Sequence, residues 1–323
     1  MKFDRNTVIG FVILAALFFG YFFYTNQEQA TYRKEQARLD SLKNANKPIS
    51  DTLGQKIDAA RADSVNNAAN AGDFQTAANG SEEIVTVSNE LFTIAFTNKG
   101  GQPKWVELRK FKNMDSGHVR LAADDFDKIG YVINTGNNRV ANTSDLYFQP
   151  AKVVKNPDSS QVISFLLSSS DSSGGTSIVH QFVIKPGDYM LDFEVQLNGA
   201  NKLLTNGVMN LTWNYTAAQQ ESDISFEKQN TQVGYMEDGE FDYHTIGRRN
   251  SVDFSGAVKW VGLRQRFFNS YLIAKESFSS GRMSWELPSN EKKILAQATT
   301  DMKVQLPVAS IGKAGFNLFY GPA

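Results

Sequence analysis

Histidine is the side chain best suited to acid–base chemistry near neutral pH, and the chain contains only His118, His180 and His244. His180 lies in the segment SIVHQFVI, where it shares one strand face with Ile178 and Phe182. Apolar neighbours of this kind favour a packed, hydrogen-bonded histidine over a general base, so we predict a core role. His118 and His244 fall in polar stretches, where we predict solvated turns.

The densest acidic group is formed by Asp124, Asp125 and Asp127, and closely spaced carboxylates can bind calcium. The group lacks the alternating spacing, the glycine and the closing glutamate of a calcium loop, so we predict a solvated turn. The sequence also has no GxSxG, HExxH, P-loop or GxGxxG motif. It therefore predicts no catalytic, metal-binding or cofactor-binding residues.

Arginines alternate with aromatic residues in the segment LRQRFF, which contains Arg264 and Arg266. A nucleic-acid surface or a lipid-facing rim would use these residue types, but no basic stripe is present elsewhere, so we predict a charged strand edge and no nucleic-acid partner. Each of the four tryptophans falls inside a candidate strand, where we predict core anchors. They are Trp105, Trp213, Trp260 and Trp285.

The elements that carry these residues have the period-two alternation of half-buried β-strands. This pattern begins at Ile84 and continues to the end of the chain; MLDFEVQL and VMNLTWNY are clear examples. Turn sequences such as NKGGQ, KPGDY and EDGE separate the strands. The segment WVGLRQRFFNSYLIA fits either a helix or a strand. We predict a mainly β fold, a large antiparallel sandwich.

Composition sets broad limits on function. The chain has 323 residues, 41% hydrophobic content and a net charge of −1, which gives no general attraction to nucleic acid. It has no cysteine, which excludes disulfides, a thiolate nucleophile and lipid attachment through sulfur.

Residues 7–24, TVIGFVILAALFFGYFFY, form an uncharged apolar run. As a helix, a run of this length would extend about 27 Å, close to the roughly 30 Å of a bilayer core. No A-x-A pattern follows its aromatic end, so we predict a retained transmembrane anchor over a cleaved signal peptide. Basic residues flank both sides of the run, so they do not decide its orientation.

Residues 26–83 are rich in Ala, Asn, Gln, Asp and Ser. Their first part contains Tyr32, Leu39 and Leu42 at helical spacing before Pro48, which predicts a helical extension of the anchor or a short coiled coil. The second part, including NNAANAGDFQTAANG, predicts a flexible segment. We therefore expect an anchor at 1–25, a polar linker at 26–83 and a β domain at 84–323.

Several stretches together resemble the amino-terminal half of a YidC-type membrane protein insertase of the Bacteroidetes-like form. They are DRNTVIGF, NKGGQPKWVELRKF, KPGDYMLDFEVQL, KWVGLRQRFFNSYLIA and LFYGP, in that order. The resemblance implies a periplasmic β-supersandwich, similar in fold to galactose-mutarotase-like enzymes. It also implies an anchor in the bacterial inner membrane whose amino end is cytoplasmic. The implied partners are the lipid bilayer, nascent membrane proteins and Sec translocon subunits.

Insertases of this family continue after the LFYGP-like motif into five further transmembrane helices. The present sequence stops at Ala323, so we expect a fragment without the insertase core. Two other hypotheses remain: a membrane-anchored carbohydrate-binding or aldose-epimerase-like domain, and a bitopic envelope scaffold that docks partner proteins.

Overall fold

The computed structural model describes residues 69–323 except 137, 171–174 and 289–292. The expected anchor and most of the expected linker lie outside these residues. Within the described part of the chain, no helix is both long enough and apolar enough to cross a membrane.

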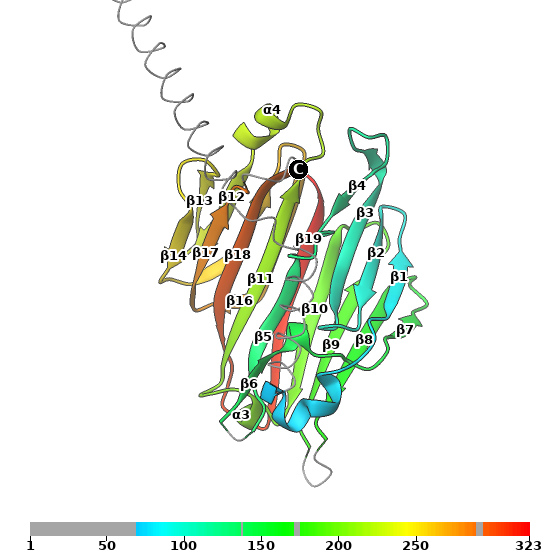
Figure 1. Cartoon of the computed structure of the whole chain (residues 1–323), viewed down its shortest axis with the longest axis vertical. Coiled ribbons are helices and arrows are strands. Elements are labelled where there is room, and N and C mark those ends of the chain that lie inside the picture. Colours follow the sequence, from blue (N-terminus) through cyan, green and yellow to red (C-terminus); the bar gives the residue numbers. More distant parts are fainter. Residues whose placement is uncertain (1–68, 137, 171–174, 289–292) are drawn as a thin grey trace, which may run out of the picture. The chain divides into compact units, whose positions relative to one another are not determined.

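The described residues form three antiparallel sheets (Figure 1). In spatial order, the nine-stranded sheet contains β13 (Glu240–Thr245), β12 (Gln232–Glu237), β15 (Val258–Arg264), β16 (Phe268–Phe278), β19 (Ile311–Pro322), β10 (Met190–Asn198), β9 (Ser177–Ile184), β8 (Gln161–Ser168) and β7 (Lys152–Lys155). The six-stranded sheet contains β14 (Ser251–Phe254), β17 (Ser280–Glu286), β18 (Ile294–Gln305), β11 (Val208–Ala218), β5 (Lys128–Asn134) and β6 (Val140–Asn142). The four-stranded sheet contains β1 (Ile84–Ser88), β2 (Phe92–Thr97), β3 (Gln102–Lys112) and β4 (His118–Leu121).

The helices of the described residues are short; η1 precedes the first strand and the others lie between strands. They are η1 (Gly72–Ala77), η2 (Thr143–Asp145), α3 (Ala200–Leu203) and α4 (Ile224–Gln229). Figure 1 shows α3 and α4 at opposite ends of the long strands. The predicted antiparallel β-sandwich is confirmed.

Side-chain alternation explains how the strands build the core. In β10, Leu191, Phe193 and Val195 are almost fully buried, and the polar residues between them are half-buried on the other face. The segment that fits either a helix or a strand forms β15 and β16, joined by a tight turn in which the Gln265 N–H donates to the Phe268 carbonyl (2.7 Å). Both strands pair with a neighbouring strand on each side, which explains why this segment forms strands and not a helix.

Aromatic rings join the sheets across the core. Phe182 of β9 and Phe193 of β10 stack with centroids 4.5 Å apart, and Phe96 of β2 lies 4.8 Å from Phe182. Phe316 of β19 extends the cluster on the other side of Phe193 (5.7 Å). Each buried ring contributes about 1.5–3 kcal/mol of transfer free energy, so this cluster is a main source of cohesion between the sheets.

The expectation of flexibility is wrong for the end of the segment before Ile84. Phe74 in η1 is 1% exposed, and Ala71 and Ala77 are buried beside it. The Asp73 N–H donates to the Thr135 carbonyl (2.8 Å), which ties η1 to the body of the domain. The segment was predicted to be flexible because most of its residues are small or polar. This composition outweighed the single large apolar side chain, Phe74, that packs the segment on the domain.

We predict that Phe74→Ala lowers the free energy of unfolding of the full chain by about 3–5 kcal/mol, because it empties a buried site. Urea unfolding in detergent, followed by tryptophan fluorescence, measures the change. The matched control is Gln75→Ala, whose side chain is exposed and should change the stability by less than about 0.5 kcal/mol. Equal stabilities of the two variants would contradict the packing of η1 on the domain.

Candidate functional site

His180 is held in the core by two hydrogen bonds. It is 1% exposed; its Nε2 lies 2.9 Å from the Tyr131 hydroxyl and its Nδ1 lies 2.9 Å from the Gly101 carbonyl oxygen. A carbonyl only accepts, so Nδ1 carries the proton and Nε2 accepts from Tyr131. Burial lowers the pKa of His180 to about 4, although the carbonyl of Gly101 opposes this shift. The neutral imidazole is therefore a structural link, and the predicted core role is confirmed.

The turn sequence NKGGQ supplies the acceptor for His180. Gly100 and Gly101 both have positive φ angles, +80° and +56°, which residues other than glycine rarely adopt. A Cβ on Gly101 would also approach ring atoms of Phe148 to 3.1 Å. The glycine pair thus lets the Gly101 carbonyl come close enough to His180 to accept a hydrogen bond from its Nδ1–H group.

The two other histidines lie in strands, so the expectation of polar turns is wrong for both. His118 begins β4 and is exposed, as expected of a solvated side chain. His244 in β13 is half-buried; its Nε2 lies 3.2 Å from the Tyr235 hydroxyl and its ring stacks on Trp285. Neither histidine lies beside His180: His118 pairs with Lys112, at the end of β3 opposite Gly101, and His244 lies in the far edge strand of the nine-stranded sheet.

The expectation of a solvated acidic turn is wrong for Asp127. Its half-buried carboxylate accepts hydrogen bonds from the N–H groups of Asp124 (2.8 Å) and Thr216. Burial raises the pKa of Asp127 to about 7, and the two N–H donors oppose this shift. Asp125 is exposed and lies 3.6 Å from Lys104 Nζ. In the described residues, no three acidic or histidine side chains converge as metal ligands.

The prediction of a charged strand edge is also wrong. Arg264 is in β15, which pairs with β12 on one side and β16 on the other. Arg266 lies in the following turn, with its guanidinium 4.5 Å from the Phe226 ring and 4.4 Å from the Phe267 ring.

Two of the four tryptophans are core anchors, as predicted. Trp213 and Trp285 are each 3% exposed. Trp105 and Trp260 are half-exposed, so the prediction is wrong for them. Trp105 lies under the Arg120 guanidinium (4.7 Å), and Trp260 packs against neighbouring rings on the outer face of the nine-stranded sheet. Strand alternation alone did not separate the inner face from the outer one at these positions.

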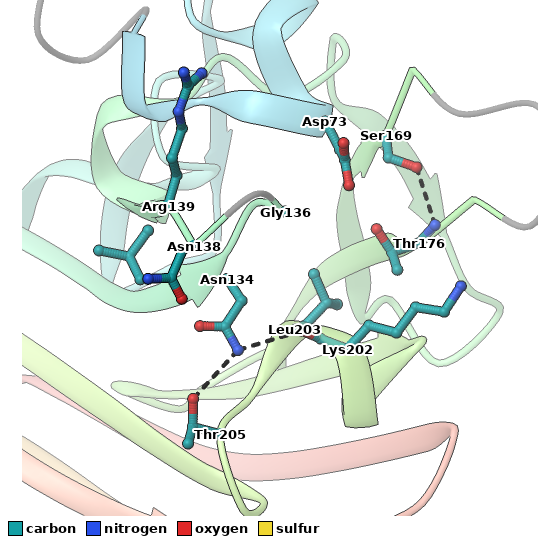
Figure 2. Close-up of a pocket in the computed structure, with 11 residues that line it drawn as sticks. Asp73, Asn134, Gly136, Asn138, Arg139, Ser169, Thr176, Lys202, Leu203 and Thr205 are labelled. Atoms are coloured by element: carbon teal, nitrogen blue, oxygen red, sulfur yellow. Dashed lines mark hydrogen bonds between the residues drawn. The ribbon is translucent and has the colours of Figure 1, made fainter.

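A polar pocket of about 450 Å³ opens near α3 (Figure 2). Asn134 donates from Nδ2 to the Lys202 carbonyl and to the Thr205 hydroxyl, both at 3.3 Å. Asp73 enters from η1 and is the only carboxylate among the described lining residues, which include no histidine. The lining suits a small polar molecule but lacks the acid–base pair that sugar epimerisation requires. No sequence pattern predicted this pocket, because its walls come from segments far apart in the chain.

Comparison with known families decides the identity of this fold. The model of the YidC periplasmic domain family matches residues 84–323. The chain belongs to this family.

Alignments over almost the whole of this chain agree with that membership. The chain is 25% identical over 338 residues to the membrane protein insertase YidC of Parabacteroides distasonis, covering 99% of the chain and 52% of the relative. It is 27% identical over 332 residues to the insertase of the same name from Porphyromonas gingivalis, covering 99% and 51%. The chain thus spans about half the length of the curated relatives it matches, and the expected resemblance is confirmed.

Solved structures similar to this YidC periplasmic domain include sugar-enzyme relatives. A putative mutarotase (YeaD) from Salmonella typhimurium has a TM-score of 0.49 at 8% identity, covering 75% of this chain and 92% of that one. A galactose mutarotase related enzyme from Lactobacillus acidophilus has a TM-score of 0.45 at 9% identity, covering 74% and 97%.

We predict a pH signature for the buried histidine of this YidC periplasmic domain. The pKa of His180 is about 4 in the folded state and about 6.5 when unfolded, so the unfolded chain binds more protons between these values. Stability contributed by the neutral imidazole is complete above pH 6.5 and is lost as the pH falls toward 4. The loss at pH 4 should reach about 3 kcal/mol, at 1.36 kcal/mol per pH unit.

The replacement His180→Gln removes the titration but keeps a donor for Gly101 and an acceptor for Tyr131. Urea unfolding of both proteins from pH 4 to pH 8 gives the difference in free energy at each pH. We expect the wild type to lose stability relative to the variant as the pH falls. A difference that is constant across this range would contradict the neutral, buried state of His180.

Proposed function

We propose that this chain is the membrane-anchored periplasmic part of a membrane protein insertase and chaperone. In this role it assists the insertion, folding and assembly of nascent membrane proteins, with or without the Sec translocon, in the bacterial inner membrane. The match of the YidC periplasmic domain family over residues 84–323 carries the proposal. Relatives named membrane protein insertase, aligned over 99% of the chain, support it.

The proposed anchor is the uncharged run at residues 7–24. Each central Leu, Ile, Phe or Val in such a run contributes about −0.3 to −0.6 kcal/mol to insertion, and the run contains no charge to oppose it. We propose a single span with the amino end in the cytoplasm, a linker after residue 25 and the β domain from residue 84 in the periplasm. The last part of this proposed linker is folded, because η1 is hydrogen-bonded to the β domain at Thr135.

The proposed work is done by contact with other polypeptides, without bond chemistry. Edge strands offer unpaired backbone groups to an extended chain. β13, one edge of the nine-stranded sheet, also presents Phe241 (59% exposed) and Tyr243 (49% exposed) on one face. The opposite edge, β7, has Lys152 and Lys155 around its valines, and edge lysines oppose strand addition. β13 is therefore the edge that we assign to peptide contact.

Site-specific photo-cross-linking tests the proposed function. Benzoylphenylalanine is placed in the full chain at Tyr243 of β13, or at Val154 of β7, which is similarly exposed (55%), in a Bacteroidetes host. We expect the probe at position 243 to form adducts with newly made membrane proteins. We also expect cross-linked adducts of the β domain to include translocon subunits. Adducts from position 154 alone would move the contact to the other edge. A lack of adducts with membrane proteins or translocon subunits from both positions would count against the function.

The proposal also predicts that the purified chain does not accelerate anomer equilibration of aldoses. His180 is sealed in the core, and four surface pockets of the described residues are all lined by other side chains. Polarimetry of freshly dissolved galactose or glucose measures the rate, with a mutarotase as the positive control. Acceleration that disappears in His180→Gln would support a sugar epimerase instead.

A further inference from the structure

Two exposed phenyl rings contact the same guanidinium at the end of the domain where Figure 1 shows α4. Phe226 in α4 is 43% exposed, and Phe267 in the β15–β16 turn is 45% exposed. The Arg266 guanidinium lies within 4.5 Å of both ring centroids. We call Phe226, Arg266 and Phe267 the aromatic clamp. Its stacking holds a cation and two apolar rings together at the surface.

A buried carboxylate fixes the clamp from below. Glu227 of α4 is 1% exposed and accepts hydrogen bonds from the N–H groups of Gln220 (3.1 Å) and Glu221 (3.1 Å). The Gln265 side chain donates to Glu227 (3.3 Å) and to the Ala218 carbonyl (2.7 Å). α4 and the β15–β16 turn are thus joined through one buried network, so the two rings have a fixed spacing.

Further cations lie at the same end of the nine-stranded sheet as the clamp. Arg264 lies beside Gln232, and Gln232 beside Thr245, across three adjacent strands. The Thr245 carbonyl accepts the Arg248 N–H (3.1 Å), which places the Arg248 and Arg249 loop at the same end. Within the described residues, no carboxylate lies within 4.0 Å of the charged nitrogens of Arg248, Arg249 or Arg264.

The acidic side chains just before α4 are already engaged. Glu221 pairs with Arg266 (3.1 Å), and Asp223 accepts the Phe226 N–H (3.0 Å) as the cap of α4. The other end of the domain, where β19 begins, differs from the α4 end. The exposed apolar residues there, Val308 and Ile311, are aliphatic. The α4 end therefore combines exposed aromatic rings with arginines that form no salt bridge within the described residues, of which Arg249 has a longer-range charge interaction with Asp242.

We propose that the α4 end rests on the surface of an anionic lipid bilayer. Phe226 and Phe267 enter the boundary between headgroups and acyl chains, where amphipathic surfaces bury aromatic rings. Arg248, Arg249 and Arg264 donate hydrogen bonds to lipid phosphates, whose geometry the planar guanidinium matches. The proposal concerns this surface alone and does not depend on the insertase function.

A reporter beside the clamp tests the contact. The chain has no cysteine, so Ser225→Cys, next to Phe226, provides a single site for a bimane label and leaves both rings in place. Val308→Cys, at the other end of the domain, is the matched reporter on the same anchored chain. Each labelled full chain is reconstituted into vesicles of phosphatidylcholine alone, or of phosphatidylcholine with phosphatidylglycerol. Both vesicle types contain a lipid-borne nitroxide quencher at the headgroup boundary.

We expect the quenching at position 225 in anionic vesicles to exceed that at position 308 by about twofold or more. It should fall in phosphatidylcholine vesicles, and it should fall when salt is raised from about 0.1 to 0.5 M, because the charges are then screened. The double replacement Arg248→Glu and Arg249→Glu should remove the excess. The same charge reversal at Lys152 and Lys155, far away on β7, should leave it unchanged.

Three outcomes would overturn the proposal. The first is equal quenching at positions 225 and 308, and the second is equal quenching in the two lipid compositions. The third is a response at position 225 that requires native membrane vesicles, which would assign the surface to a membrane protein. The salt titration uses the reporter without charge reversal, so the test does not depend on correct folding of the Arg248/Arg249 variant.

Discussion

The parallel contact between Phe182 and Phe193 is the interaction on which the rest of the domain depends. The two rings lie on adjacent strands and are almost parallel, with centroids 4.5 Å apart and an interplanar angle of 4°. Phe96 contacts them from the four-stranded sheet and Phe316 from β19. Offset stacking adds about 0.5–1.5 kcal/mol to the burial of each pair, and it also fixes the register of the strands that carry the rings. A one-residue slip would turn these rings to the outer face.

Closing the sheets over this core buries or half-buries three ionisable side chains, and each of them has hydrogen-bond partners. His180 is bonded at both ring nitrogens, Glu227 accepts several N–H groups and Asp127 accepts two. An unsatisfied buried polar group costs about 1–3 kcal/mol, which explains why each has a defined acceptor or donor. The residues that looked most capable of chemistry are thus used to join strands and turns.

Local sequence predicted the fold well because the period of two is a local property. The alternation in β10 and the glycine pair before β3 each determine structure over a few residues. The burial of Asp127 and Phe74 could not be predicted in this way. Each depends on a distant segment, Thr216 for Asp127 and Thr135 for the turn that carries Phe74. The surface at α4 has the same character, since Phe226 and Phe267 come together only when two separate loops meet.

The buried network beneath that surface has a further implication. Replacing buried charged groups by well-packed apolar ones is often neutral or stabilising, so a carboxylate such as Glu227 is weak evidence for a stability role. Its geometry gives it another one: it joins α4 to the β15–β16 turn, and the exposed rings above it contribute no core burial. An apolar substitute would pack, but it would not accept the N–H groups of Gln220 and Glu221 and the Gln265 side chain, so the two loops would separate. The network therefore maintains the spacing between the exposed rings of Phe226 and Phe267, which are not needed to form the core.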